Sequence, residues 1–136
     1  MPEGPVLGLD LGDARVGMAI SDPDRLIAVP LETVGAEDAE RAVARTVSER
    51  GVRVVVVGLP LSMSGEAGPR AEAAAAFAKK LEDSLGISVV LQDERLSTVE
   101  AKRALAAAGT RGRERKRRVD RSAATVILQA WLDASR

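Results

Sequence analysis

The stretch "GLDLGDARVG", residues 8–17, places one carboxylate, Asp10, inside a short apolar segment and follows it with a glycine-containing turn. In the run that comes after the turn, residues 15–21, apolar side chains alternate with smaller ones, which is the period of a half-buried strand. The two runs predict a strand, a turn at residues 12–13 and a second strand. Asp10 therefore ends a strand and fits neither a helix cap nor a turn. It is either a buried aspartate that backbone amides satisfy or a residue of a functional site.

Further along the chain, a third apolar run covers residues 26–33 and follows the turn-forming cluster Asp22-Pro23-Asp24. Three runs joined this closely predict an antiparallel meander. The period then changes to that of a helix over residues 36–50, which ends at Gly51. The apolar stripe of this helix consists of Ala39, Ala42, Val43, Thr46 and Val47.

The segment "RVVVVGLP", residues 53–60, is apolar without alternation, which is typical of a parallel central strand covered on both faces. A loop over residues 62–68 leads into an alanine-rich helix that begins at Pro69 and ends at Gly86. One face of that helix carries Phe77, Leu81 and Leu85.

The last third of the chain begins with a short β-branched strand over residues 88–92. "STVE", residues 97–100, has the spacing of a capping box and predicts a helix that ends near Gly109. A polar connection, with residues 110–119 expected to be disordered, precedes a final helix over about residues 120–134. The order predicts an α/β fold, a mixed sheet with helices on both faces, in a single domain that spans residues 1–136.

Composition excludes several classes of chemistry. The 136 residues include no cysteine and no histidine, which removes disulfides, zinc sites of the usual kind and nucleophile systems that need a histidine base. The 20 basic and 20 acidic side chains give a net charge of zero. Because no apolar run approaches the roughly 18 residues of a membrane span, we expect a cytoplasmic protein without membrane contact.

Three acidic positions are candidates for a site. Glu94 belongs to the pair Asp93-Glu94 at a strand end, where side chains alternate in direction, so only one of the two can face a given pocket. The other would meet solvent or pair with Arg95. Asp120 precedes the last helix and could be its N-cap, although its spacing from Ala124, Ile127 and Trp131 also places it on the stripe that faces the core. Together with Asp10, these acids would meet at one edge of the sheet.

A cluster of three carboxylates needs a cation. Two carboxylates about 4 Å apart repel by roughly 4 kcal/mol at an effective dielectric of about 20. Because every available ligand is a hard oxygen, Mg²⁺ or Mn²⁺ is the expected cofactor. Such ions support hydrolysis of phosphodiesters, with the carboxylates acting as ligands.

The segment "RGRERKRRVDR", residues 111–121, has a local charge of plus five, so the remainder of the chain carries minus five. It is either a solvated loop or an arm that holds phosphates beside the acids. With two aromatic residues, both on core stripes, the chain offers no stacking platform for bases. We expect contacts to nucleic acid from the following residues: Arg15, Ser62, Ser64, Arg111, Arg113, Arg115, Lys116, Arg117, Arg118 and Arg121.

The segments "GLDLGDARVGMAISD", "VVVGLPLSMSGEAG", "DERLST" and "VDRSAATVILQAWL" occur in this order and together resemble the bacterial YqgF (RuvX) family of Holliday junction resolvase-like nucleases. The resemblance implies a ribonuclease H-like fold with a five-stranded mixed sheet. It also implies a catalytic triad of Asp10, Glu94 and Asp120, and a role in maturation of the 5′ end of 16S ribosomal RNA. Junction resolvases proper carry their second acid after strand four, where this chain has Gly58-Leu59-Pro60.

We therefore expect a nuclease that depends on a divalent metal and processes precursor 16S ribosomal RNA, as a monomer or weak homodimer. Cleavage of branched DNA is the first alternative, and a non-catalytic module that binds nucleic acid is the second. Actin-like phosphotransferases open with a similar strand, turn and strand, but they need a second lobe for which 136 residues leave no room.

Overall fold

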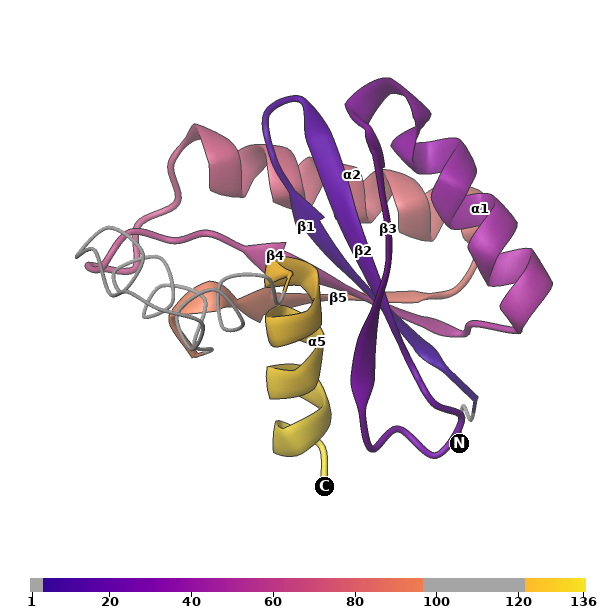
Figure 1. Cartoon of the computed structure of the whole chain (residues 1–136). Helices are drawn as coiled ribbons and strands as arrows, with labels where there is room; N and C mark the ends of the chain where they lie inside the picture. Colours follow the sequence, from indigo (N-terminus) through magenta and orange to yellow (C-terminus); the bar gives the residue numbers. More distant parts are fainter. Residues whose placement is uncertain (1–3, 97–121) are drawn as a thin grey trace, which may run out of the picture.

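The computed structural model describes residues 4–96 and 122–136. Within these residues five strands form one sheet in the order β3-β2-β1-β4-β5 (Figure 1). β1, β2 and β3 form an antiparallel meander, and β1, β4 and β5 are parallel, as predicted. The bounds of the strands are β1 Val6–Leu11, β2 Arg15–Ser21, β3 Ala28–Gly35, β4 Val54–Leu59 and β5 Ser88–Asp93.

Helices cover both faces of the sheet. Figure 1 shows α1 and α2 along one face and α5 crossing the other. Each face has its own apolar core, because side chains on successive strand residues point in opposite directions. Leu7, Leu9 and Val57 belong to the core beneath α1 and α2, whereas Val6 and Val56 belong to the core beneath α5. The bounds of the helices are α1 Ala39–Arg50, α2 Pro69–Leu85 and α5 Ala123–Ala134, with short 3-10 turns η1 Ala36–Asp38 and η2 Glu94–Leu96.

The helices on the first face follow the predicted pattern closely. Ala39, Ala42, Val43 and Thr46 of α1 are buried, and Val47 packs against the same core. Both α1 and α2 end at a glycine in the left-handed region, Gly51 with φ 69° and Gly86 with φ 66°. The predicted start of the first helix is three residues early, because residues 36–38 form η1 rather than the first turn of α1.

Two other boundaries differ from the prediction for a local reason. β3 begins at Ala28 rather than at residue 26, because the Asp22 carboxylate accepts hydrogen bonds from the amides of Leu26 (2.8 Å) and Ile27 (2.7 Å) and holds them in a turn. These amides also lower the pKa of Asp22. α5 begins at Ala123, and its N-cap is Ser122, whose Oγ accepts a hydrogen bond from the Thr125 amide at 3.1 Å.

The predicted helix over residues 97–109 and the disorder predicted for residues 110–119 lie outside the described residues. In the described part of the chain, none of the helices combines the length and apolarity that crossing a bilayer requires.

Candidate functional site

Asp10 lies next to the carboxyl end of β1, on the face of the sheet that α5 covers. Its partner in β2 is Gly17, where an added Cβ would lie 3.8 Å from the Cβ of Ala124 in α5. Gly8, two residues earlier on the same strand, lies beneath α5 as well, with an added Cβ only 2.7 Å from the Cβ of Leu128. Alternation along β1 therefore directs the Asp10 side chain toward the first turn of α5.

The Asp10 carboxylate is partly buried and incompletely satisfied. Its Oδ1 is inaccessible to solvent and has no hydrogen-bond partner among the described residues. A buried carboxylate oxygen without a partner is costly, so such an atom is expected to meet a cation or a donor. This is the property expected of an oxygen ligand to a divalent metal ion.

Glu94 follows β5 directly and is 7% exposed. Its carboxylate packs over Gly58 of β4: an added Cβ at Gly58 would lie 2.9 Å from Glu94 Oε2 and 2.6 Å from Ile127 Cδ1 of α5. Because Ile127 belongs to the core beneath α5, the Glu94 carboxylate lies on the same face of the sheet as Asp10.

The register of the strands brings the two acids to one edge. Leu9 of β1 pairs with Val57 of β4, so Asp10 and Gly58 are the next residues along two adjacent parallel strands. Adjacent strands are about 4.8 Å apart. The structure thus brings together Asp10 and Glu94, on the same face and at the same carboxyl edge of the sheet.

Asp93 is directed away from this pair, toward Arg95. Its carboxylate accepts hydrogen bonds from the Arg95 guanidinium, the shortest at 2.7 Å from Nη2, and from the Arg95 amide at 2.9 Å. The hydrogen bonds from the Arg95 side chain lower the pKa of Asp93. The sequence left open which of the two neighbouring acids faces the site. In the structure, the Glu94 side chain lies against β4 and the Asp93 side chain pairs with Arg95.

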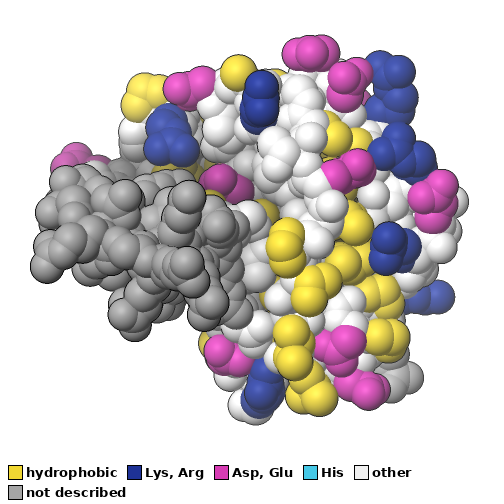
Figure 2. Space-filling view, in the orientation of Figure 1, with side chains coloured by type: hydrophobic (Ala, Val, Ile, Leu, Met, Phe, Trp, Pro, Cys, Tyr) yellow, Lys and Arg dark blue, Asp and Glu magenta, His cyan; other side chains and the backbone are white. Residues whose placement is uncertain are grey.

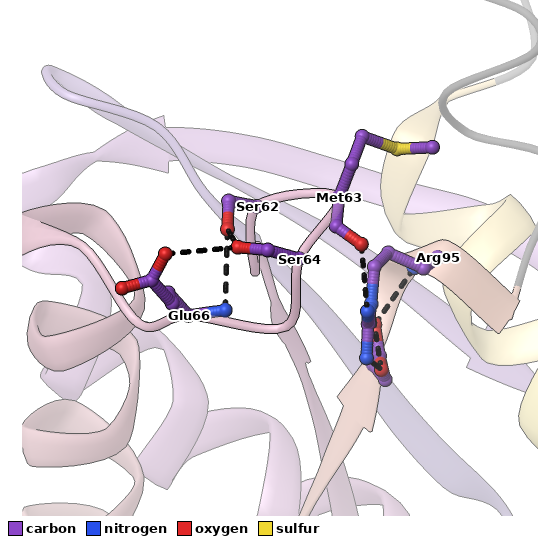
Figure 3. Close-up of polar contacts among 6 residues, drawn as sticks. Ser62, Met63, Ser64, Glu66 and Arg95 are labelled. Carbon is purple, nitrogen blue, oxygen red and sulfur yellow. Dashed lines mark hydrogen bonds and ion pairs between the residues drawn. The ribbon is translucent and has the colours of Figure 1, made fainter.

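Arg95 also links the end of β5 to the loop that follows β4. Its Nη1 donates a hydrogen bond to the Met63 carbonyl at 3.3 Å (Figure 3). Within that loop, the hydroxyls of Ser62 and Ser64 are 2.9 Å apart, and the Ser64 hydroxyl donates to the Glu66 carboxylate at 3.0 Å. Both predicted serine contacts therefore lie on an internally bonded loop that Arg95 holds against β5.

A pocket of about 330 Å³ opens between this loop, the start of α2 and Glu94. Ser62 lines it, whereas Ser64 does not. Arg70 also lines the pocket and was not predicted from the sequence; the signal that could have identified it is a cation directly after Pro69, the first residue of α2. Among residues 4–96 and 122–136, those lining the pocket are Pro60, Leu61, Ser62, Gly68, Pro69, Arg70, Glu94 and Arg95.

The remaining predicted residues divide into two groups. Arg15 is exposed at the start of β2. Asp120 and the basic residues of segment 111–121 lie outside the described residues.

Within residues 4–96 and 122–136, no group of three acidic side chains is close enough to hold a metal ion. In Figure 2, acidic and basic side chains are interspersed over the visible described surface, without one large patch of either sign.

Comparison with known proteins assigns the family. The family described as "RuvX: Holliday junction resolvase" matches residues 4–134. The chain belongs to this family. The resemblance found in the sequence motifs is thereby confirmed. Among similar curated RuvX relatives, a protein of Chloroflexus aurantiacus is 48% identical over 134 residues, covering 96% of this chain and 88% of the relative. One of Geobacillus kaustophilus is 46% identical over 136 residues, covering 96% and 98%. Both carry the name "Putative pre-16S rRNA nuclease".

Two solved structures have a fold similar to that of this chain over nearly its whole length. RuvC of T. thermophilus in complex with Holliday junction substrate gives a TM-score of 0.60 at 15% identity, covering 97% of this RuvX chain and 95% of RuvC. The yeast mitochondrial Holliday junction resolvase Ydc2 gives 0.50 at 13% identity, covering 96% and 78%. At these identities the likeness concerns the fold, and it confirms the ribonuclease H-like architecture with a five-stranded mixed sheet.

Proposed function

We propose that this RuvX protein is a nuclease that depends on a divalent metal ion and cleaves structured nucleic acid, with precursor 16S ribosomal RNA as its substrate. The observation that carries the proposal is the meeting of Asp10 and Glu94 on one face of the sheet edge, with Asp10 Oδ1 buried and unpartnered among the described residues. The names of the curated RuvX relatives support the choice of substrate.

Asp10, Glu94 and Asp120 would hold the ion, which is Mg²⁺ or Mn²⁺ because the donors are carboxylates. Asp120 is three residues before Ala123 in the sequence, and three residues of chain span at most about 11 Å. Since Ala124 lies against the β2 partner of Asp10, this reach is compatible with a shared site. When bound, such an ion would activate a water and stabilise charge on the leaving oxygen of a phosphodiester.

The chain's own residues would position the substrate. The pocket beside Glu94 carries Arg70, a cation suited to a phosphate, together with the Ser62 hydroxyl. Arg15 and the basic segment 111–121 would contact more distant phosphates, which supports binding to backbone and shape rather than to base identity.

A four-way DNA junction is the second candidate substrate, and two observations favour it. The family is described as a Holliday junction resolvase, and the fold is similar to that of RuvC in complex with such a junction. A module that binds nucleic acid without cleaving it is the third candidate.

A cleavage assay separates the three. A 5′ fragment of precursor 16S RNA and a four-way DNA junction are incubated with the wild-type protein, with and without Mn²⁺. Asp10→Asn tests the site, and Asp13→Asn, an exposed acid in the turn after β1, is the matched control for the lost charge. We expect cleavage of the RNA that needs Mn²⁺, that Asp10→Asn abolishes while binding persists, and that Asp13→Asn leaves unchanged. Cleavage by Asp10→Asn at the wild-type rate would refute the proposed site.

A further inference from the structure

We propose that Gly58 is a positioning residue for Glu94: its missing side chain leaves the space in which the Glu94 carboxylate lies beside Asp10. This inference rests on the proposed function, because it assigns Gly58 a role in presenting a metal ligand. Gly58 itself would touch neither metal nor substrate.

The space above Gly58 is filled from two directions. An added Cβ would lie 2.9 Å from Glu94 Oε2, 3.5 Å from Glu94 Cδ and 2.6 Å from Ile127 Cδ1. Real Cβ atoms essentially never approach another heavy atom more closely than 3.0 Å. A side chain on β4 and the present position of the Glu94 carboxylate therefore exclude each other.

The conflict would be resolved by movement of Glu94. Gly58 does not have a positive φ, so alanine is compatible with its backbone and the effect of a substitution comes from space alone. Ile127 Cδ1 is the end of a flexible side chain and can yield. Glu94 is 7% exposed and lines the pocket, so displacement moves its carboxylate toward the pocket and away from Asp10 on β1.

Gly8 provides a comparison on the same face of the sheet. An added Cβ there would lie 2.7 Å from Leu128 Cβ and 3.3 Å from the Ala124 carbonyl, and its nearest contacts include no carboxylate. Alanine at Gly8 thus disturbs the packing of α5 on the sheet, as alanine at Gly58 does, but its nearest contacts do not include Glu94.

The test uses variants that separate the two contacts of Gly58. Ile127→Val removes Cδ1, so in the double variant Gly58→Ala/Ile127→Val only the contact with Glu94 remains. Ile127→Val alone is its reference, and Gly8→Ala measures the effect of disturbed α5 packing. For each protein, the thermal unfolding temperature is measured without metal and across a Mn²⁺ titration, and cleavage of the RNA fragment is measured across the same titration.

We expect the double variant to unfold without metal within a few degrees of Ile127→Val. We also expect its half-saturating Mn²⁺ concentration to rise about 10- to 100-fold, the range for groups that orient metal ligands. Gly8→Ala should lower the unfolding temperature but raise the half-saturating Mn²⁺ concentration less than the double variant does. If the double variant responds to Mn²⁺ as Ile127→Val does, the positioning role is wrong while the proposed function stands. If the wild-type protein is neither stabilised by Mn²⁺ nor active with it, both fail.

Discussion

Replacement of Asp10 by asparagine tests the candidate site without any substrate. The substitution keeps the shape of the side chain and removes one of two carboxylates that meet at the edge of the sheet. In the metal-free protein these carboxylates repel each other, so the variant should be more stable than the wild type. Most substitutions of partly buried residues destabilise a protein, which makes the expected sign diagnostic.

The magnitude follows from the geometry. Asp10 and Gly58 are adjacent across two strands, and Glu94 Oε2 lies 2.9 Å from the Cβ position of Gly58. The two carboxylates are thus separated by roughly one strand spacing, about 5 Å. At an effective dielectric of about 20, this corresponds to a repulsion of about 3 kcal/mol, which is an upper bound because solvent and salt screen part of it. We expect a gain of about 1 to 2 kcal/mol, or roughly 3 to 10 °C in unfolding temperature.

Adding metal should reverse the order of stability. A ligand at about 100 times its dissociation constant stabilises the folded state by about 2.7 kcal/mol, and the variant should lose most of this gain. The assay is thermal unfolding by circular dichroism, first in EDTA and then in Mn²⁺, with Asp13→Asn as the control for net charge. A variant that is less stable than the wild type in EDTA and equally stabilised by Mn²⁺ would refute the inferred closeness of the two acids.

Three further predictions concern the surroundings of the site. Ser122→Ala should destabilise the protein by about 1 to 2 kcal/mol in urea unfolding, because the α5 amide at Thr125 loses its cap, and Ser122→Asp should restore most of it. Asp93→Asn should flatten the pH dependence of stability below about pH 4. The lowered pKa of Asp93 means that its contribution is present above its unfolded pKa and is lost as the pH falls through the folded value. Replacing three arginines of the basic segment by alanine, at Arg115, Arg117 and Arg118, should weaken RNA binding. The slope of log K against log salt concentration, measured by fluorescence anisotropy, should fall by about 2 to 3. An unchanged slope would exclude that segment from the interface.

The fold was predictable wherever burial alone decides the pattern. Val55, Val56 and Val57 are all fully buried, which is why an unbroken apolar run correctly indicated a central parallel strand. The stripe of α1 was predictable for the same reason, since burial selects residues at helical spacing. These features depend on whether a whole face of a strand or helix is buried, and the pattern of apolar residues in the sequence indicates this directly.

Boundaries and pocket residues depend on single contacts, which periodicity does not encode. The amides of residues 26 and 27 donate hydrogen bonds to the Asp22 carboxylate instead of joining the sheet, so β3 begins only at Ala28 although both residues are apolar. Ser122, not an acid, caps α5. Arg70 is a site candidate solely because the loop after β4 and the end of β5 enclose a pocket around it. Such residues require the tertiary arrangement before their role can be inferred.

For the two acids at the sheet edge, residue types alone identify the candidates but do not predict how closely they approach each other. Asp10 and Glu94 could be selected from the sequence because both end strands, but their approach depends on a third position that has no side chain. In the sequence, Gly58 is notable only because it stands where junction resolvases have an acidic residue. In the structure, the Glu94 carboxylate, which follows β5 directly, occupies the space over Gly58, and Ile127 borders this space on the other side. Although glycine carries no functional group, its replacement should therefore weaken Mn²⁺ binding, and the Gly58 variants test this expectation.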